Sequence, residues 1–111
     1  MEVKRGDVVV IVGTDEIGRP RPAVVVQANE LGGDTTAVLR CPITSDLTAR
    51  LSVRPSIGPR AENGLHAPSQ IMTDRLVALR RDRIRRVIGA IDPDTQEQLD
   101  QALLAVLALA R

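Results

Sequence analysis

Short apolar runs separated by polar, glycine- or proline-containing turns fill the first ninety residues, and this pattern predicts a sheet of short strands. Two runs, 8–12 and 23–27, are almost continuously apolar, which is typical of strands covered on both faces. The further predicted strands are 36–43, a weak one at 51–54, then 69–73, 75–79 and 86–90. Short strands at this spacing indicate a small closed or half-closed barrel.

Proline and glycine set the expected interruptions of this sheet. Pro42 falls inside the run 36–43, where it marks an edge, a bulge or a strand end, so Thr44 is expected near the rim of the sheet. The segments 13–20 and 55–62 contain proline, glycine and polar residues, which predicts loops, and the second is expected to be mobile.

The last twenty residues change to the period of a helix. Asp92 is a favourable N-cap, Pro93 suits the first helical position, and Asp94 favours the positive end of the helix dipole. The apolar residues that follow form one stripe at i, i+3, i+4 and i+7 spacing: Leu99, Ala102, Leu103, Val106, Leu107 and Ala110. We therefore expect a mainly β (α+β) fold that ends in a long helix, which packs on the barrel or on a second subunit.

Composition narrows the class of protein further. The chain has 111 residues, which corresponds to a single domain over 1–111, and it contains no Phe, Tyr or Trp. Cys41 is the only cysteine, so no internal disulfide is expected, which fits a reducing cytoplasm. No apolar run approaches the roughly 18 residues of a membrane span. The sequence predicts a cytoplasmic protein with no membrane segment.

Charge is unevenly distributed, although the formal net charge is only +1. Residues 1–91 carry fourteen basic and ten acidic residues, a balance of +4, and residues 92–111 carry one and four, a balance of −3. Fourteen of the fifteen basic residues are arginine, the cation suited to planar phosphate contacts. The densest cluster, which could steer a polyanion or form a solvated strand edge, is Arg80, Arg81, Arg83, Arg85 and Arg86. Without aromatic side chains, phosphate contacts and hydrogen bonds must replace base stacking if RNA binds.

The segment GRPRPAVVVQ at 18–27 is the strongest candidate for chemistry. Pro20 and Pro22 push the residues before them, Arg19 and Arg21, toward extended geometry, and alternation then sends both guanidiniums to the same side. An arginine anchored at the mouth of a buried strand can meet a phosphate bidentately. The same spacing also fits a surface arginine at a loop–strand junction.

A series of motifs, in order along nearly the whole chain, resembles the MazF/PemK family of toxin ribonucleases. The motifs are KRGDVVVI at 4–11, RPAVVVQ at 21–27, CPITS at 41–45, NGL at 63–65, PSQIM at 68–72, DRLVAL at 74–79 and RIRRVIGAIDPDT at 83–95. The resemblance implies a small SH3-like, CcdB-type β-barrel with a C-terminal helix. It also implies a metal-independent, sequence-specific endoribonuclease that cleaves single-stranded RNA, with Arg21 and Thr44 as the catalytic pair.

Further residues follow from the resemblance and from their chemistry. Substrate contacts are expected from Arg19, Ser45, His66 and Arg75. Histidine is the residue type most often used for acid–base catalysis, but relatives often carry another basic residue after Asn-Gly-Leu, so His66 is expected to bind substrate more than to transfer protons. Asp46 is an alternative proton acceptor, two residues beyond Thr44. In some relatives a polar Gln-Ile-Arg-Thr segment occurs where this chain has 75–78, Arg-Leu-Val-Ala.

The chemistry assigned to Arg21 is electrostatic. A guanidinium is almost never neutral at pH 7, so a role as general base would cost about 8 kcal/mol. Arg21 is instead expected to stabilise the transition state at phosphorus while Thr44 holds a non-bridging oxygen. With one His and one Cys the sequence lacks metal-ligand spacing, and no cofactor is expected.

Two other functions remain open at this point. CcdB-type toxins share the fold but poison gyrase, and the chain's end, Leu-Ala-Arg, lacks the Trp-Gly-Ile expected of that group. A barrel that binds nucleic acid or protein without catalysis is the third. For the leading function, the resemblance implies a homodimer and a cognate antitoxin whose disordered, acidic tail covers the arginine-lined groove.

Overall fold

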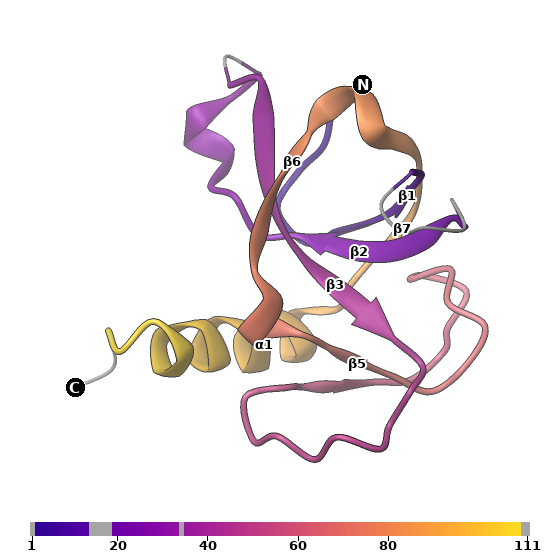
Figure 1. The fold of residues 1–111 in the computed structure, drawn as a ribbon, viewed down its shortest axis with the longest axis vertical. Coiled ribbons are helices and arrows are strands. Elements are labelled where there is room, and N and C mark those ends of the chain that lie inside the picture. Colours follow the sequence, from indigo (N-terminus) through magenta and orange to yellow (C-terminus); the bar gives the residue numbers. More distant parts are fainter. Residues whose placement is uncertain (1, 14–18, 34, 110–111) are drawn as a thin grey trace.

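The computed structural model of the chain describes residues 2–13, 19–33 and 35–109, and it shows a strongly bent antiparallel sheet with one helix beneath it (Figure 1). The strands are β1 (Asp7–Ile11), β2 (Arg21–Val25), β3 (Ala37–Thr44), β4 (Ser56–Ile57), β5 (Ser69–Ile71), β6 (Val77–Arg80) and β7 (Ile84–Ala90). Three single-turn 3-10 helices, η1 (Asn29–Leu31), η2 (Thr73–Arg75) and η3 (Arg81–Arg83), connect strands, and helix α1 covers Pro93–Val106.

Strand β3 is the centre of the sheet. The order of the strands is β4-β5-β3-β2-β1-β7, and β6 pairs with β3 as well. The first half of β3 pairs with β6 from Ala37 to Arg40, and its end pairs with β5 at Ile43 and Thr44. Because one long strand serves two partners on the same side, the sheet curls into a half-barrel, which confirms the predicted mainly β fold with a terminal helix.

Pro42 lies inside β3, where the prediction of an edge, bulge or strand end was wrong. It pairs with Ala23 of β2, and its carbonyl accepts a hydrogen bond from Met72 N at 2.8 Å. Proline has no amide hydrogen to donate. The nitrogen of Pro42 faces the gap between the two partners, β6 and β5, so no hydrogen bond of either ladder is lost. Thr44 ends the strand, as expected.

The predicted weak strand at 51–54 was also wrong. These residues form a turn in which Arg54 N donates to Leu51 O at 3.0 Å, and the neighbouring strand, β4, begins at Ser56 within the predicted loop 55–62. The turn is held by side chains: Arg54 Nε and Nη2 donate to the two carboxylate oxygens of Asp74 at 2.8 and 3.0 Å. The other predicted strands exist, with ends shifted by at most two residues.

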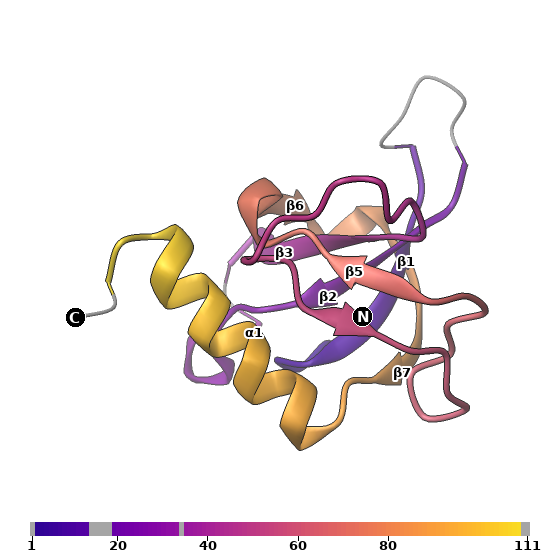
Figure 2. The same cartoon turned by 90° about the horizontal axis from the view of Figure 1, so that it is seen from below.

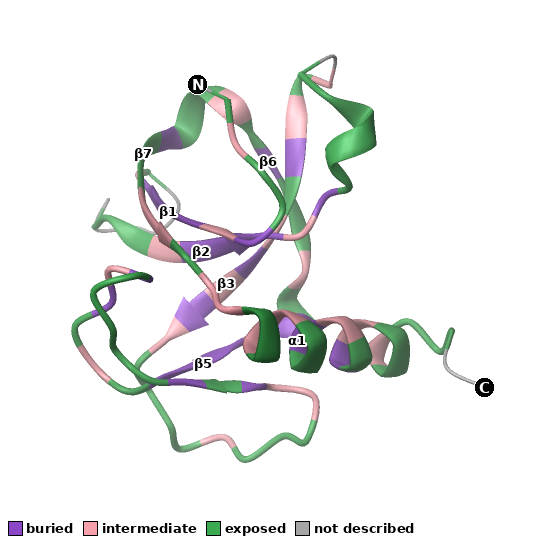
Figure 3. Cartoon of the chain, turned by 180° about the vertical axis from the view of Figure 1, so that it is seen from behind, coloured by how far each residue is buried: buried purple, intermediate pink, exposed green. Residues whose placement is uncertain are grey.

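Buried residues are concentrated in the strands (Figure 3), and their apolar side chains form two clusters. The first joins the sheet to the helix and is formed by Val8, Val24, Cys41, Ile43, Ile57, Leu65, Ile71 and Leu99. The second lies inside the curl of the sheet and is formed by Val9, Ile11, Ala23, Val25, Val38, Leu79 and Ile84. Neither contains an aromatic ring, so packing depends on branched aliphatic side chains.

The helix begins as the sequence predicts and ends earlier. The side chain of Asp92 accepts a hydrogen bond from Thr95 N at 2.7 Å, and Pro93 is the first helical residue. Figure 2 shows α1 lying across one side of the sheet, where only Leu99 and Ala102 are fully buried. The rest of the stripe is half-buried or exposed up to Leu107, and Ala110 lies outside the described residues. In the described part of the chain, no helix is long and apolar enough to cross a bilayer.

Candidate functional site

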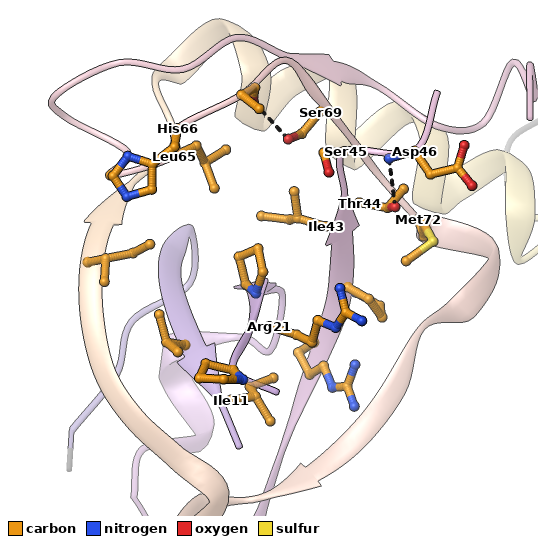
Figure 4. A pocket seen from close by; sticks show the side chains of 18 of the residues that line it. Ile11, Arg21, Ile43, Thr44, Ser45, Asp46, Leu65, His66, Ser69 and Met72 are labelled. Carbon is orange, nitrogen blue, oxygen red and sulfur yellow. Dashed lines mark hydrogen bonds between the residues drawn. The ribbon is translucent and has the colours of Figure 1, made fainter. Parts of the chain in front are cut away.

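A groove of about 720 Å³ opens where the ends of β1, β2 and β3 meet strand β7 and the loop 64–69 (Figure 4). Its walls are partly apolar, from residues such as Ile11, Pro22 and Ile43, and partly charged. Among the described residues that line it, four are arginines and one, Asp46, carries a carboxylate. The groove is therefore positively charged, as a binding site for a polyanion requires.

Arg21 and Thr44 come together on one face of neighbouring strands. The β2–β3 ladder pairs Ala23 with Pro42, and continuing this register by two residues places Arg21 across from Thr44. Side chains of directly opposed residues point to the same face of an antiparallel pair. Both residues line the groove, so the two sequence motifs that contain them are joined by strand pairing.

The hydroxyl of Thr44 is oriented by a turn that follows it. Thr44 Oγ1 accepts a hydrogen bond from Asp46 N at 3.1 Å (Figure 4). Because the oxygen accepts this N–H, its own proton can be donated to a substrate oxygen. The arrangement suits a hydroxyl that binds a phosphate oxygen.

Asp46 is committed to the same turn. Its Oδ1 accepts hydrogen bonds from Thr48 N at 3.0 Å and from Thr48 Oγ1 at 2.7 Å. These bonds lower the pKa of the Asp46 carboxyl. A general base near neutrality needs a raised pKa, so the geometry argues against Asp46 as the proton acceptor.

His66 lies across the groove opening from Thr44 in Figure 4. Its loop is held by the buried Asn63, whose Oδ1 accepts from Leu65 N at 3.0 Å and whose Nδ2 donates to Gly58 O at 2.9 Å. Gly64 has a φ of +71°, and an added Cβ would lie 2.5 Å from Ile88 O, so only glycine lets the loop approach β7 this closely.

The remaining predicted contacts divide into two groups. Ser45 and Arg75 line the groove with Arg21, Thr44 and His66. Arg19 is exposed before β2 and is not among the described residues that line the groove. The loop 13–20, which precedes Arg21, lies outside the described residues at 14–18.

Two groove arginines received no assigned role from the sequence. Arg86 was predicted only as a member of the cluster 80–86, which the structure divides: Arg80 Nη2 bonds to Asp82 at 2.6 Å, and Arg81 Nε bonds to Thr35 O at 2.7 Å. Arg40 was missed entirely. Alternation along β3 could have found it, since residues 40, 42 and 44 share one face of the strand.

Metal-ligating side chains are not clustered in this region. Over the described ranges, no group of three or more His, Cys, Asp or Glu residues could hold a metal ion. Cys41 is buried in the core, and burial raises the pKa of its thiol to about 12, so the thiolate needed for nucleophilic chemistry is disfavoured.

Comparison with known proteins gives a consistent result. Residues 4–107 match the family model for the PemK-like, MazF-like toxin of type II toxin–antitoxin systems. A relative from Mycolicibacterium smegmatis, named "Probable endoribonuclease MazF", is 27% identical over 109 residues, which cover 97% of this chain and 99% of the relative.

Solved structures share the fold. A mycobacterial endoribonuclease in complex with its cognate antitoxin superposes with a TM-score of 0.80 at 20% identity, over 98% of both chains. A MazE–MazF structure from Deinococcus radiodurans gives a TM-score of 0.79 at 18% identity, over 99% of both chains.

Proposed function

The chain belongs to the PemK-like, MazF-like family of type II toxin–antitoxin toxins and is an endoribonuclease; we propose that the arginine-lined groove is its RNA-cleaving site, with Arg21 and Thr44 as the catalytic residues. The observation that carries this proposal is the strand register, which brings Arg21 across from Thr44 on the groove wall.

The proposed reaction is an attack within the RNA. The 2′-oxygen loses its proton and bonds to phosphorus, the bond from phosphorus to the 5′-oxygen breaks, and that oxygen gains a proton. The products are a 2′,3′-cyclic phosphate and a 5′-hydroxyl. Negative charge grows on the non-bridging oxygens in the transition state, so preorganised donors accelerate the step.

The two residues supply these donors. Arg21 provides a planar, always charged fork that can bond to two phosphate oxygens at once. Thr44 donates its hydroxyl proton to a non-bridging oxygen, which can only accept, while its own oxygen accepts from Asp46 N. Ser45, Arg75 and His66 contact the strand on either side of the reacting phosphate, and Arg19 meets it where the strand leaves the groove.

RNA cleavage is favoured over the two alternatives. The relative that covers almost the whole chain is named an endoribonuclease, which favours RNA over gyrase as the target. Arginine and threonine side chains also contact phosphates in proteins that only bind nucleic acid, so a digest of RNA decides between cleavage and binding.

The protein is expected to bind an antitoxin and to act in the cytoplasm. The toxin structures that resemble this chain include one with its cognate antitoxin and one of a MazE–MazF pair. We expect an antitoxin whose disordered, acidic tail folds into the groove, since the groove offers four arginines to an acidic segment. The enzyme acts in the cytoplasm, where its RNA substrate is found.

The first prediction tests the catalytic assignment. Purified protein should cut single-stranded RNA in the presence of EDTA, and a single 2′-deoxyribose on the 5′ side of the cut should abolish cleavage while binding persists. Arg21→Ala should lose at least the ~3 kcal/mol typical of one transition-state donor, which corresponds to at least a hundredfold fall in kcat. Single-turnover rates with gel-resolved products measure this.

Arg85→Ala is the matched control, since Arg85 is an exposed arginine on β7 that does not line the groove. Cleavage of the deoxy-substituted RNA at the normal rate, a strict requirement for magnesium, or full activity of Arg21→Ala would each contradict the mechanism.

A further inference from the structure

Arg40 carries, among the described residues, the one buried side-chain polar atom that has no hydrogen-bond partner. Its Nε is shielded from solvent and has no hydrogen-bond partner among the described residues. A buried N–H without a partner is rare in folded proteins, because each one forfeits its bonds to water. The group therefore points to a ligand that is bound during function.

The surroundings of Arg40 are apolar. Its cross-strand neighbours are Val25 on β2 and Val77 on β6, and the next residue on its own face toward the start of β3 is Val38. No salt bridge to Arg40 occurs within the described part of the chain. Burial lowers the pKa of this guanidinium, and no carboxylate of the described residues offsets that effect.

The position of Arg40 defines what the ligand would be. Arg40 and Thr44 lie on the same face of β3 and both line the groove. Arg40 and Thr44 are four positions apart along the strand, which separates their Cα atoms by about 13 Å. At that distance along the groove, the guanidinium would contact a different part of an extended RNA strand from the phosphate that Thr44 binds.

We propose that Arg40 binds a second, non-scissile phosphate of the RNA and so sets the position of the strand in the groove. This proposal rests on the proposed function of the groove. The phosphate would accept a hydrogen bond from Arg40 Nε and offset the unfavourable burial of its charge. The free protein has neither of these stabilising interactions. Arg40 is thus a substrate-positioning residue whose stability cost is recovered on binding.

Because the contact is made equally in the ground state and the transition state, it should affect binding more than chemistry. Arg40→Met keeps the apolar stem and removes the fork. We expect the KM for RNA to rise roughly tenfold, as for loss of one phosphate contact, with kcat unchanged. Melting of the free variant should occur at the same temperature as wild type or higher, since a desolvated charge has been removed.

Binding is measured separately from cleavage. The probe is a fluorescein-labelled single-stranded RNA that spans the cut site mapped with the wild-type protein, with one 2′-deoxyribose to block cleavage. Fluorescence anisotropy over a salt series should show that the slope of log K against log salt falls by about 0.7 in Arg40→Met. Arg40→Lys, which keeps the charge, should restore most of this slope, and Arg85→Met should leave affinity and slope nearly unchanged.

A neutral methylphosphonate placed at one phosphate at a time then locates the contact. At one non-scissile position, this substitution should weaken RNA binding by the wild type. The same substitution should leave the affinity of Arg40→Met unchanged, because that variant already lacks the contact. If the wild type binds while Arg40→Met has the same affinity and slope, the assignment of Arg40 is wrong and the groove's function stands. A fall in kcat without a change in KM would overturn it too, and absence of RNA binding by the wild type would overturn both proposals.

Discussion

The hydroxyl of Thr44 illustrates how one residue acquires a chemical role from its neighbours. Thr44 ends β3, and the next turn directs Asp46 N at its oxygen at 3.1 Å. This bond occupies one acceptor position of the oxygen and leaves the hydroxyl proton available for donation to a phosphate oxygen. The same turn ties Asp46 to Thr48, which keeps that carboxylate ionised and away from proton transfer.

A second prediction follows at this scale. Thr44→Val keeps the shape of the side chain and removes the donor, so we expect kcat to fall roughly a hundredfold, as for loss of one oxyanion donor. Thr44→Ser keeps the donor and should retain much more activity than Thr44→Val. Rates on one defined RNA decide this, with unchanged melting temperatures as the control for folding; equal rates for the two variants would remove the hydroxyl from the mechanism.

At the scale of elements, two glycines allow the loop that carries His66 to pack closely against β7. A Cβ on Gly89 would lie 2.3 Å from Glu62 O and 2.6 Å from Asn63 C, and one on Gly64 would clash with Ile88 O. The contact is closed by a hydrogen bond from Ala90 N to Glu62 O at 2.8 Å. The groove wall at His66 therefore depends on backbone-to-backbone contact between a loop and a strand.

The third prediction tests this contact between the loop and β7. Gly89→Ala must push the loop away, so we expect a loss of about 1–3 kcal/mol in the free energy of unfolding and a weaker affinity for RNA. Gly58→Ala is the matched control, because a Cβ there meets nothing within 4 Å and should change neither property. Thermal melts and anisotropy are the measurements, and a stable Gly89→Ala with normal RNA binding would show that the loop position is unimportant.

For the whole molecule, the small core is the central physical fact. The chain has 111 residues and no aromatic side chain, so its two clusters bury only aliphatic groups. Large apolar side chains remain exposed on the last turns of α1 and on the sheet, among them Leu104, Leu107, Leu39, Val77 and Val87. Exposed apolar area of this kind favours association in a twofold interface.

The fourth prediction is therefore a homodimer. Sedimentation velocity at micromolar concentration should show twice the mass of 12.0 kDa, and the melting temperature should rise with concentration, as linkage requires. A single 12.0 kDa species that melts at the same temperature at every concentration would contradict it.

The sequence alone determined the features that depend on near neighbours. The Asp92 cap and Pro93 fix the start of α1 because capping is local, and apolar runs place the strands within a few residues because burial follows side-chain type. The motifs that contain Arg21 and Thr44 were also visible, since Pro20 and Pro22 constrain the backbone around Arg21.

Only the tertiary structure decided what depends on strand pairing across the chain. The partner change of β3 at Pro42 has no local signal, and neither has the exclusion of Arg19 from the groove. Arg40 looked like an ordinary strand residue, because the burial of its Nε without a hydrogen-bond partner arises only in the folded chain, where β2 and β6 pair with its strand. Local sequence specifies the elements, but the register between distant strands decides which side chains share a site, and register is fixed by long-range burial.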